Sequence, residues 1–211
     1  MRVAELWRYP VKGLRGEALE RVEIAADGIP GDRALRVADE RGTVTGRRKQ
    51  RMIGLPATLG DGGEPLVADE PWSSEAAATA IREVAGEGAA LVRVEGGHDF
   101  DAAPILVVTD GGIAELGYDR RRFRPNIVIE GVDGAAERDW VRGRLRVGEA
   151  LLFVSEPCER CVITTIDPDT TEVDLDVLRR ARLELGGVMG VYCSVLEPGA
   201  VAVGDAVAFT D

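Results

Sequence analysis

The chain has 211 residues, 45% of them hydrophobic, which suits one compact unit with a sizeable core. Its formal net charge of −11 argues against a sequence-independent nucleic-acid binder, because such a protein needs a face that neutralises phosphates. No run of about 18 apolar residues occurs, and the amino terminus lacks the apolar stretch of a secretory signal, so we expect no membrane association and a cytoplasmic location.

Short segments with alternating or β-branched patterns, separated by turn signals, predict strands along most of the chain. In chain order these are residues 3–9, 19–24, 34–38, 91–94, 105–109, 126–130, 145–147, 151–155, 162–166, 191–196 and 206–209. Helices are predicted over residues 75–84, 111–116 behind Asp110, and 175–185 behind Asp174. The glycine-containing stretch 60–72 predicts a loop or short insert. Many short strands with few helices indicate a strand-rich α+β fold, either a barrel or a sandwich.

The motif Cys158-Glu159-Arg160-Cys161 admits several interpretations. A redox dithiol should open a helix, whereas the residues after Cys161 predict a strand, so this interpretation is disfavoured. A structural zinc site needs four ligands, and only Cys193 and the sole histidine, His98, are left to complete it. The motif also fits two buried structural thiols, or one metal ligand beside a packing cysteine. Three cysteines, an odd number, fit reduced thiols better than a disulfide framework.

Cationic and polar residues gather in separate short segments of the chain. They are Lys12 and Gly13 after a predicted strand, Arg33 in Gly31-Asp32-Arg33, then Thr45, Arg47 and Arg48, and finally Arg124 and Asn126 around Pro125. Each segment alone is also explained by a turn, a surface ion pair or a solvated charge run. Together with a cysteine beside Arg160, they indicate an anionic, metal-bearing cofactor, since guanidinium groups bind oxyanions and a thiolate binds soft metals.

In combination, these segments resemble the MOSC (molybdenum cofactor sulfurase C-terminal) domain proteins. The matching pieces are residues 6–12, 31–33, 45–47, 101–104, 122–128, 158–161 and 165–170. Within the family, the pattern is most similar to the mitochondrial amidoxime-reducing component and its bacterial relatives. The resemblance implies a MOSC-type β-barrel with a smaller N-terminal β-rich lobe and a few peripheral helices. It divides the chain into an N-terminal MOSC-associated segment, 1–95, and a MOSC domain, 96–211, in one compact unit.

The resemblance also implies a function. Cys161 matches the cysteine that ligates molybdenum, and the cationic and polar positions match residues around the pyranopterin and its phosphate: Lys12, Gly13, Arg33, Thr45, Arg47, Arg124 and Asn126. The implied cofactor is the molybdenum cofactor, and the implied reaction reduces N-hydroxylated compounds from N–OH to N–H. Electrons would come from a separate ferredoxin- or flavin-type reductase, since the chain lacks an appended ferredoxin-like cysteine cluster. The resemblance implies pyridoxal phosphate binding only as a general property attributed to the family.

Two positions depart from the family pattern: Gly13 stands where relatives often have serine, and Thr171 stands where they usually have glycine. Two other functions stay open on the sequence alone. The chain would be a sulfur carrier, or a module that binds and delivers the molybdenum cofactor without turnover of its own. Alternatively, its arginine-rich segments would capture some other organic phosphate.

Overall fold

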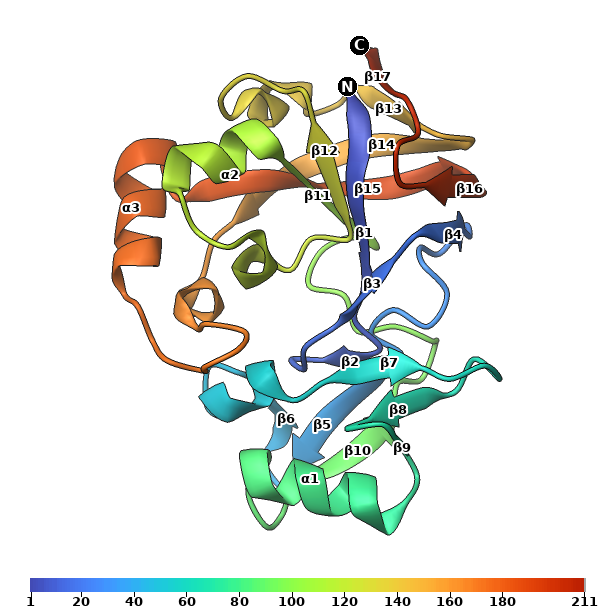
Figure 1. The fold of residues 1–211 in the computed structure, drawn as a ribbon, viewed down its shortest axis with the longest axis vertical. Coiled ribbons are helices and arrows are strands. Elements are labelled where there is room, and N and C mark those ends of the chain that lie inside the picture. Colours follow the sequence, from blue (N-terminus) through green and yellow to red (C-terminus); the bar gives the residue numbers. More distant parts are fainter. Residues whose placement is uncertain (211) are drawn as a thin grey trace.

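A computed structural model describes residues 1–210 and shows two lobes stacked along the long axis of the molecule (Figure 1). The strands of the larger lobe are β1 (Arg2–Arg8), β3 (Glu17–Leu19), β4 (Arg21–Ile24), β11 (Ile105–Thr109), β12 (Ile127–Glu130), β13 (Arg144–Val147), β14 (Ala150–Glu159), β15 (Val188–Glu197), β16 (Gly199–Ala202) and β17 (Val207–Thr210). The strands of the smaller lobe are β2 (Val11–Lys12), β5 (Leu35–Asp39), β6 (Gly42–Val44), β7 (Ala57–Leu59), β8 (Pro65–Val67), β9 (Glu70–Pro71) and β10 (Ala90–Arg93).

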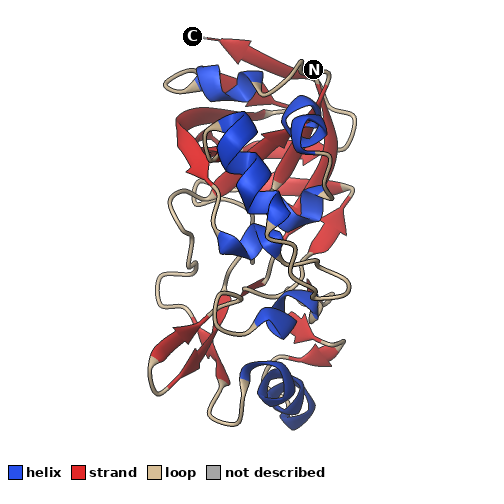
Figure 2. Ribbon diagram, turned by 90° about the vertical axis from the view of Figure 1, so that its left-hand side faces the viewer, coloured by secondary structure: helices blue, strands red, loops and turns tan. Residues whose placement is uncertain are grey.

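The helices of both lobes are short. The smaller lobe has α1 (Glu75–Ala85) and the 3-10 helix η1 (Gln50–Gly54). The larger lobe has α2 (Asp110–Leu116), α3 (Asp176–Leu185) and the 3-10 helices η2 (Arg120–Phe123), η3 (Ala136–Trp140) and η4 (Val162–Thr165). Figure 2 shows the helices of the larger lobe in front of its sheet and α1 at the base of the smaller lobe. None of the helices within residues 1–210 combines the length and apolar character needed to cross a membrane.

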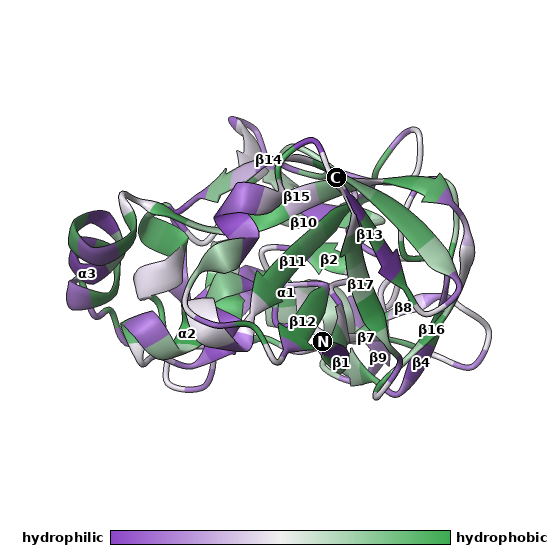
Figure 3. Ribbon diagram, turned by 90° about the horizontal axis from the view of Figure 1, so that it is seen from above, coloured by the Kyte–Doolittle hydropathy of each residue, from purple (hydrophilic) through white to green (hydrophobic). Residues whose placement is uncertain are grey.

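One curled sheet of eight strands organises the larger lobe, in the order β17-β13-β14-β15-β11-β12-β1-β3. Only β11 and β12 pair in parallel, and the other neighbours are antiparallel. Alternate residues of β14 are buried, namely Ala150, Leu152 and Val154, because successive side chains of a strand point to opposite faces. The apolar colouring of the central strands in Figure 3 follows this core. Because β1 and β3 belong to it, the predicted segments 1–95 and 96–211 share one sheet.

The smaller lobe packs α1 against two small sheets. One sheet has the order β10-β5-β2, with β6 paired to β5, and the other has the order β7-β8-β9. Ser74 caps α1 by accepting a 3.1 Å hydrogen bond from the Ala77 N–H, and Ala77 and Ile81 of this helix are fully buried. The polypeptide passes repeatedly between the lobes, since β2 lies in the smaller one between β1 and β3 of the larger. Both lobes therefore hold residues from the first part of the chain.

The predicted strand-rich fold class is confirmed, and the three predicted helices are present within one residue of their expected bounds. Three local predictions are wrong. Residues 19–24 form two strands, β3 and β4, in different sheets. Residues 60–72 hold β8 and β9 rather than a structureless insert. The first helical residue of α2 is Asp110 itself, because the Thr109 hydroxyl caps the helix by accepting from the Gly112 N–H at 3.1 Å.

The predicted strand over residues 162–166 is also wrong, since this segment forms η4. The Thr164 hydroxyl donates to the Cys161 carbonyl at 2.9 Å, and the Thr165 hydroxyl donates to the Val162 carbonyl at 2.7 Å. These local bonds satisfy carbonyls that a strand would have paired with a neighbour, so they override the β propensity of the sequence. No strand follows Cys161, so the predicted strand no longer counts against a redox dithiol.

Gly190, the third residue of β15, is a position where only glycine fits. Its φ is +77°, and a side-chain carbon there would lie 2.5 Å from the Val107 carbonyl oxygen of β11. We expect Gly190→Ala to lower the free energy of unfolding by about 3 kcal/mol, because backbone strain and overpacking add. Gly186→Ala is the matched control: its φ is +67° but nothing lies within 4 Å, so we expect a loss of about 1 kcal/mol. Urea denaturation measures both, and equal losses would contradict the packing argument.

Candidate functional site

A cavity of about 570 Å³ lies where the two lobes meet, and both lobes contribute to its walls. All eight residues that the sequence assigned to a cofactor site line it: Lys12, Gly13, Arg33, Thr45, Arg47, Arg124, Asn126 and Cys161. Positions separated by up to 149 residues in sequence are thus brought to one surface. A single cavity with several convergent polar groups is a typical ligand site.

Strand ends and turns carry these side chains. Lys12 ends β2, Thr45 directly follows β6, and Cys161 lies between the end of β14 and the first residue of η4. Arg33 and Arg124 have φ angles of 50° and 54°, a left-handed conformation that non-glycine residues rarely adopt. Strained backbone that persists at a cavity wall is characteristic of functional sites.

A buried hydrogen-bond network fixes Asn126 and Arg33. The Asn126 amide donates to the carboxylate of Asp32 at 3.1 Å, and its carbonyl oxygen accepts from the Leu106 N–H at 3.1 Å and from the Arg33 guanidinium at 3.2 Å. Asp32 is fully buried; it pairs with Arg33 and accepts a 2.7 Å bond from the Tyr9 N–H. Asp32 neutralises the charge on Arg33, so this arginine is held rigidly in the cavity wall.

Arg124 is a cation without a carboxylate partner among residues 1–210. Its guanidinium donates to the Leu14 carbonyl at 2.7 Å and lies over the Tyr9 ring, 4.3 Å from the centroid. Burial and the neighbouring positive charge of Arg33 lower the pKa of Arg124 to about 10, although Tyr9 opposes the change. Burial also raises the pKa of Tyr9 to about 12. A desolvated guanidinium that protein groups do not neutralise is suited to binding an anion from outside.

Lys12 faces two carboxylates at another part of the wall. Its ammonium lies 2.9 Å from Asp99 and 2.9 Å from Asp101. Although burial acts in the opposite direction, the hydrogen bond and charge of Lys12 lower the pKa of Asp101. An incoming phosphate that uses Lys12 therefore competes with these two carboxylates.

Cys161 is the most accessible of the three cysteines, all of which are free thiols. Arg47 lines the same cavity, and its proximity to the Cys161 sulfur raises the pKa of the Arg47 guanidinium. Cys158 is buried and contacts the Tyr192 hydroxyl. The pKa of Tyr192 is raised, mainly by burial and to a smaller extent by Cys158. Cys193 is fully buried away from the cavity, and burial raises the pKa of its thiol. Cys161 is thus the cysteine best placed to hold a metal in the cavity.

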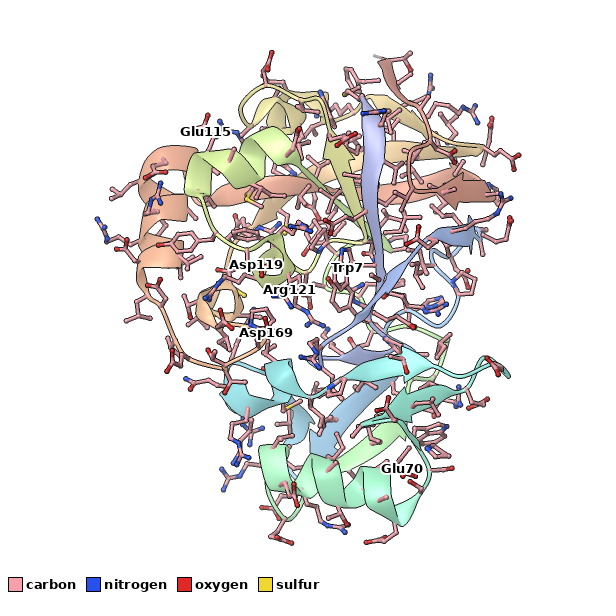
Figure 4. The ribbon with its side chains drawn as sticks, in the orientation of Figure 1. Trp7, Glu70, Glu115, Asp119, Arg121 and Asp169 are labelled. Atoms are coloured by element: carbon pink, nitrogen blue, oxygen red, sulfur yellow. The ribbon has the colours of Figure 1, made fainter. Side chains whose placement is uncertain are left out.

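An ion-pair cluster holds the segment after Cys161 in place. Arg121 of η2 lies 2.6 Å from both Asp119 and Asp169, and Asp169 is also 3.5 Å from Arg15. Figure 4 shows Asp119, Arg121 and Asp169 together between the two lobes. Arg122, which follows Arg121 in η2, donates to the Thr165 carbonyl at 2.9 Å. Networks of this kind hold a turn more firmly than single surface pairs do, so η4 is fixed against η2.

Comparisons with known proteins match this architecture. Two family models cover most of the chain: the MOSC N-terminal beta barrel domain over residues 1–102 and the MOSC domain over residues 109–208. The chain belongs to the MOSC family.

Relatives of this MOSC protein include mitochondrial amidoxime-reducing components. The component 2 protein of Macaca fascicularis is 28% identical over 97% of this chain and 82% of the relative. The component 1 protein of Homo sapiens is 25% identical over 97% of this chain and 82% of the relative. The crystal structure of the YuaD protein from Bacillus subtilis aligns with a TM-score of 0.54 at 15% identity, covering 98% of this chain and 93% of that one. At this level of identity the structural likeness shows the fold alone.

Arg160 is a wall residue of the MOSC site that was not predicted from the sequence. Arg160 donates to the carbonyls of Met189 at 2.8 Å and Phe123 at 3.0 Å, and its Nη2 is buried without a partner. We assigned Arg160 only an effect on the neighbouring thiol, since nothing in the sequence shows that it crosses to β15 and η2. Asp99 and Arg36 were missed for the same reason, although the matched segment 101–104 pointed to the adjoining turn.

Proposed function

We propose that this MOSC protein is a molybdenum-cofactor-dependent oxidoreductase that reduces N-hydroxylated compounds, with Cys161 as the thiolate ligand of the metal. The relatives named amidoxime-reducing components, aligned over 97% of the chain, support the reaction class. The observation that carries the site assignment is one cavity that combines Cys161 with Arg124, a partly buried cation lacking a carboxylate partner in the described chain. We also propose the division into segments 1–95 and 96–211.

The wall residues fit an anionic pterin phosphate. Arg160 has a buried, unpartnered nitrogen at the cavity, and Arg36 has another. Such groups are costly to bury without a partner, so a ligand with several acceptor oxygens would satisfy them. In our proposal Lys12, Gly13, Arg33, Thr45, Arg47, Arg124 and Asn126 surround the pyranopterin and its phosphate.

The bound cofactor would supply two-electron redox chemistry at molybdenum. Reduction of R–NHOH to R–NH₂ consumes two electrons and two protons and releases water. The protein's own residues would bind the anion through Arg124, present one thiolate through Cys161, and hold that thiolate beside Arg47. The Asp32–Arg33–Asn126 network would keep the wall in one geometry while substrate enters and leaves.

Metal and pterin analysis of the purified protein tests the proposal. The chain should be expressed in cells that make the cofactor, and we expect near-stoichiometric molybdenum and pterin. The loaded protein should reduce an aromatic amidoxime to the amidine with reduced methyl viologen as the electron source. Metal-free protein that carries a persulfide on Cys161, as seen by mass spectrometry, would instead favour a sulfur carrier. Loaded protein without turnover would favour a cofactor-delivery module.

A further inference from the structure

A cluster of exposed basic side chains flanks the cavity on the smaller lobe. This basic rim consists of Arg47, Arg48, Lys49 and Arg51, between β6 and the second residue of η1, and all four are exposed. The chain carries a net charge of −11 and only two lysines, one of which is in the rim. Among the described residues, only Arg48 of this set forms an ion pair, at 2.8 Å from Asp39. The rim is therefore a positive patch on an acidic protein.

The backbone of the rim is fixed, so the patch is preformed. The N–H groups of Arg48 and Lys49 both donate to the Thr45 carbonyl, at 2.9 Å and 3.0 Å. The next turn is anchored by Met52 and Ile53, which are buried in the smaller lobe. Arg51 donates to the Glu83 carbonyl of α1 at 3.3 Å. A preformed surface loses little conformational entropy when a partner docks.

The rim adjoins the cavity that holds the proposed metal ligand. Arg47 is exposed and lines this cavity together with Cys161. A protein seated on the rim would lie closer to Cys161 than one seated on the far end of the larger lobe. Under the proposed function, each turnover consumes two electrons, which an electron donor has to deliver.

We infer that the basic rim is the docking surface for an acidic one-electron carrier protein. This inference rests on the proposed function. An acidic carrier is the expected occupant because its negative surface complements the positive charge of the rim. Opposite charge steers encounter and raises the association rate, an effect that salt screens. Two successive encounters deliver the two electrons that each turnover consumes, and the two protons come from solvent.

Charge reversal of the rim tests the inference on the molybdenum-loaded protein. The variant is Arg48→Glu/Lys49→Glu/Arg51→Glu, which leaves Arg47 in place. An acidic [2Fe–2S] ferredoxin, kept reduced by NADPH and its reductase, drives amidoxime reduction. At low ionic strength we expect kcat/KM for ferredoxin to fall about tenfold or more, with the difference shrinking at high salt. With reduced methyl viologen, turnover should stay within about twofold of wild type. Calorimetric titration with oxidised ferredoxin should show the same weakening without turnover.

The matched control reverses three exposed arginines of the larger lobe. Arg21→Glu/Arg144→Glu/Arg146→Glu changes the net charge equally, and β13, which carries two of these residues, lies at the opposite end of the molecule from β6 in Figure 1. Arg146 pairs with Glu197 at 2.8 Å, as Arg48 pairs with Asp39, and both pairs lie at the surface. We expect the control to lower ferredoxin kcat/KM by less than about twofold.

Distinct outcomes separate the inference from the proposed function. Equal losses in rim and control variants, or an unchanged rim variant, overturn the docking surface. The wild-type protein could bind phosphatidylserine vesicles while the rim variant does not, with no effect of the rim variant on ferredoxin. That result would assign the rim to a membrane surface and would also overturn the docking surface. Wild-type protein that holds no molybdenum, or that fails to turn over with methyl viologen, overturns the proposed function instead.

Discussion

Replacement of Cys161 by alanine is expected to lower amidoxime reduction by about a hundredfold or more and to deplete bound molybdenum. The reason is that Cys161 is the one cysteine that both lines the cavity and is not buried, so its loss would leave the metal without a protein thiolate. Molybdenum and pterin are measured by mass spectrometry and pterin fluorescence after identical purification. Turnover is measured with methyl viologen, so that donor docking does not enter.

Two further cysteine variants make this prediction specific. Cys193→Ala removes a buried thiol outside the cavity and should leave metal content unchanged. Cys158→Ala removes the buried neighbour that contacts Tyr192. If Cys158→Ala loses molybdenum and Cys161→Ala keeps it, the ligand assignment moves to Cys158. Equal, substoichiometric metal in wild type and Cys161→Ala refutes a thiolate-held metal altogether.

Arg124→Met is expected to lower retention of the pterin about tenfold or more while the apoprotein stays folded. A charge-assisted hydrogen bond to a buried group contributes about 1.5–3 kcal/mol, and methionine removes it without shortening the side chain much. The apoprotein is expected to tolerate the change because Arg124 donates only to the Leu14 carbonyl and leaves no carboxylate unpaired. Pterin released on denaturation is quantified by fluorescence, and folding is followed by thermal unfolding of the apoprotein.

Arg138→Met is the control for Arg124→Met. Arg138 is also partly buried and donates only to carbonyls, those of Ala135 at 3.2 Å and Leu185 at 3.1 Å, but it does not line the cavity. It should cost similar stability and leave pterin content unchanged. Arg124→Lys, which keeps the charge but loses the planar fork, should fall between wild type and Arg124→Met. Full pterin retention in Arg124→Met would contradict an anion site at this guanidinium.

Residue identities and order in the sequence were sufficient to predict the strand-rich fold and a set of side chains that proved to line one cavity. The strand predicted over residues 105–109 from its β-branched pattern is β11, and the structure shows that all five residues are buried. The helix predicted over residues 75–84 is α1, and the structure adds its Ser74 cap. Both features are local, so they are legible in a short window of sequence.

Local patterns failed at two segments, for different physical reasons. The β-branched residues after Cys161 predicted a strand, yet the hydroxyls of Thr164 and Thr165 close a helical turn instead. Residues 19–24 were predicted as one strand, but the chain switches sheets after Leu19 because β3 pairs with β1 whereas β4 pairs with β16. Such choices depend on which edges are free in the assembled fold.

The sequence by itself determined which chemical groups are present: three thiols, several guanidinium groups and a lysine near turn signals. Tertiary structure alone decided which of these groups are neutralised. Arg33 is paired with the buried Asp32, whereas Arg124 meets only a carbonyl and Arg160 keeps an unpartnered nitrogen. The physical reason is that the net charge felt by a ligand depends on burial and on distances between residues remote in sequence, and neither quantity is encoded in local spacing.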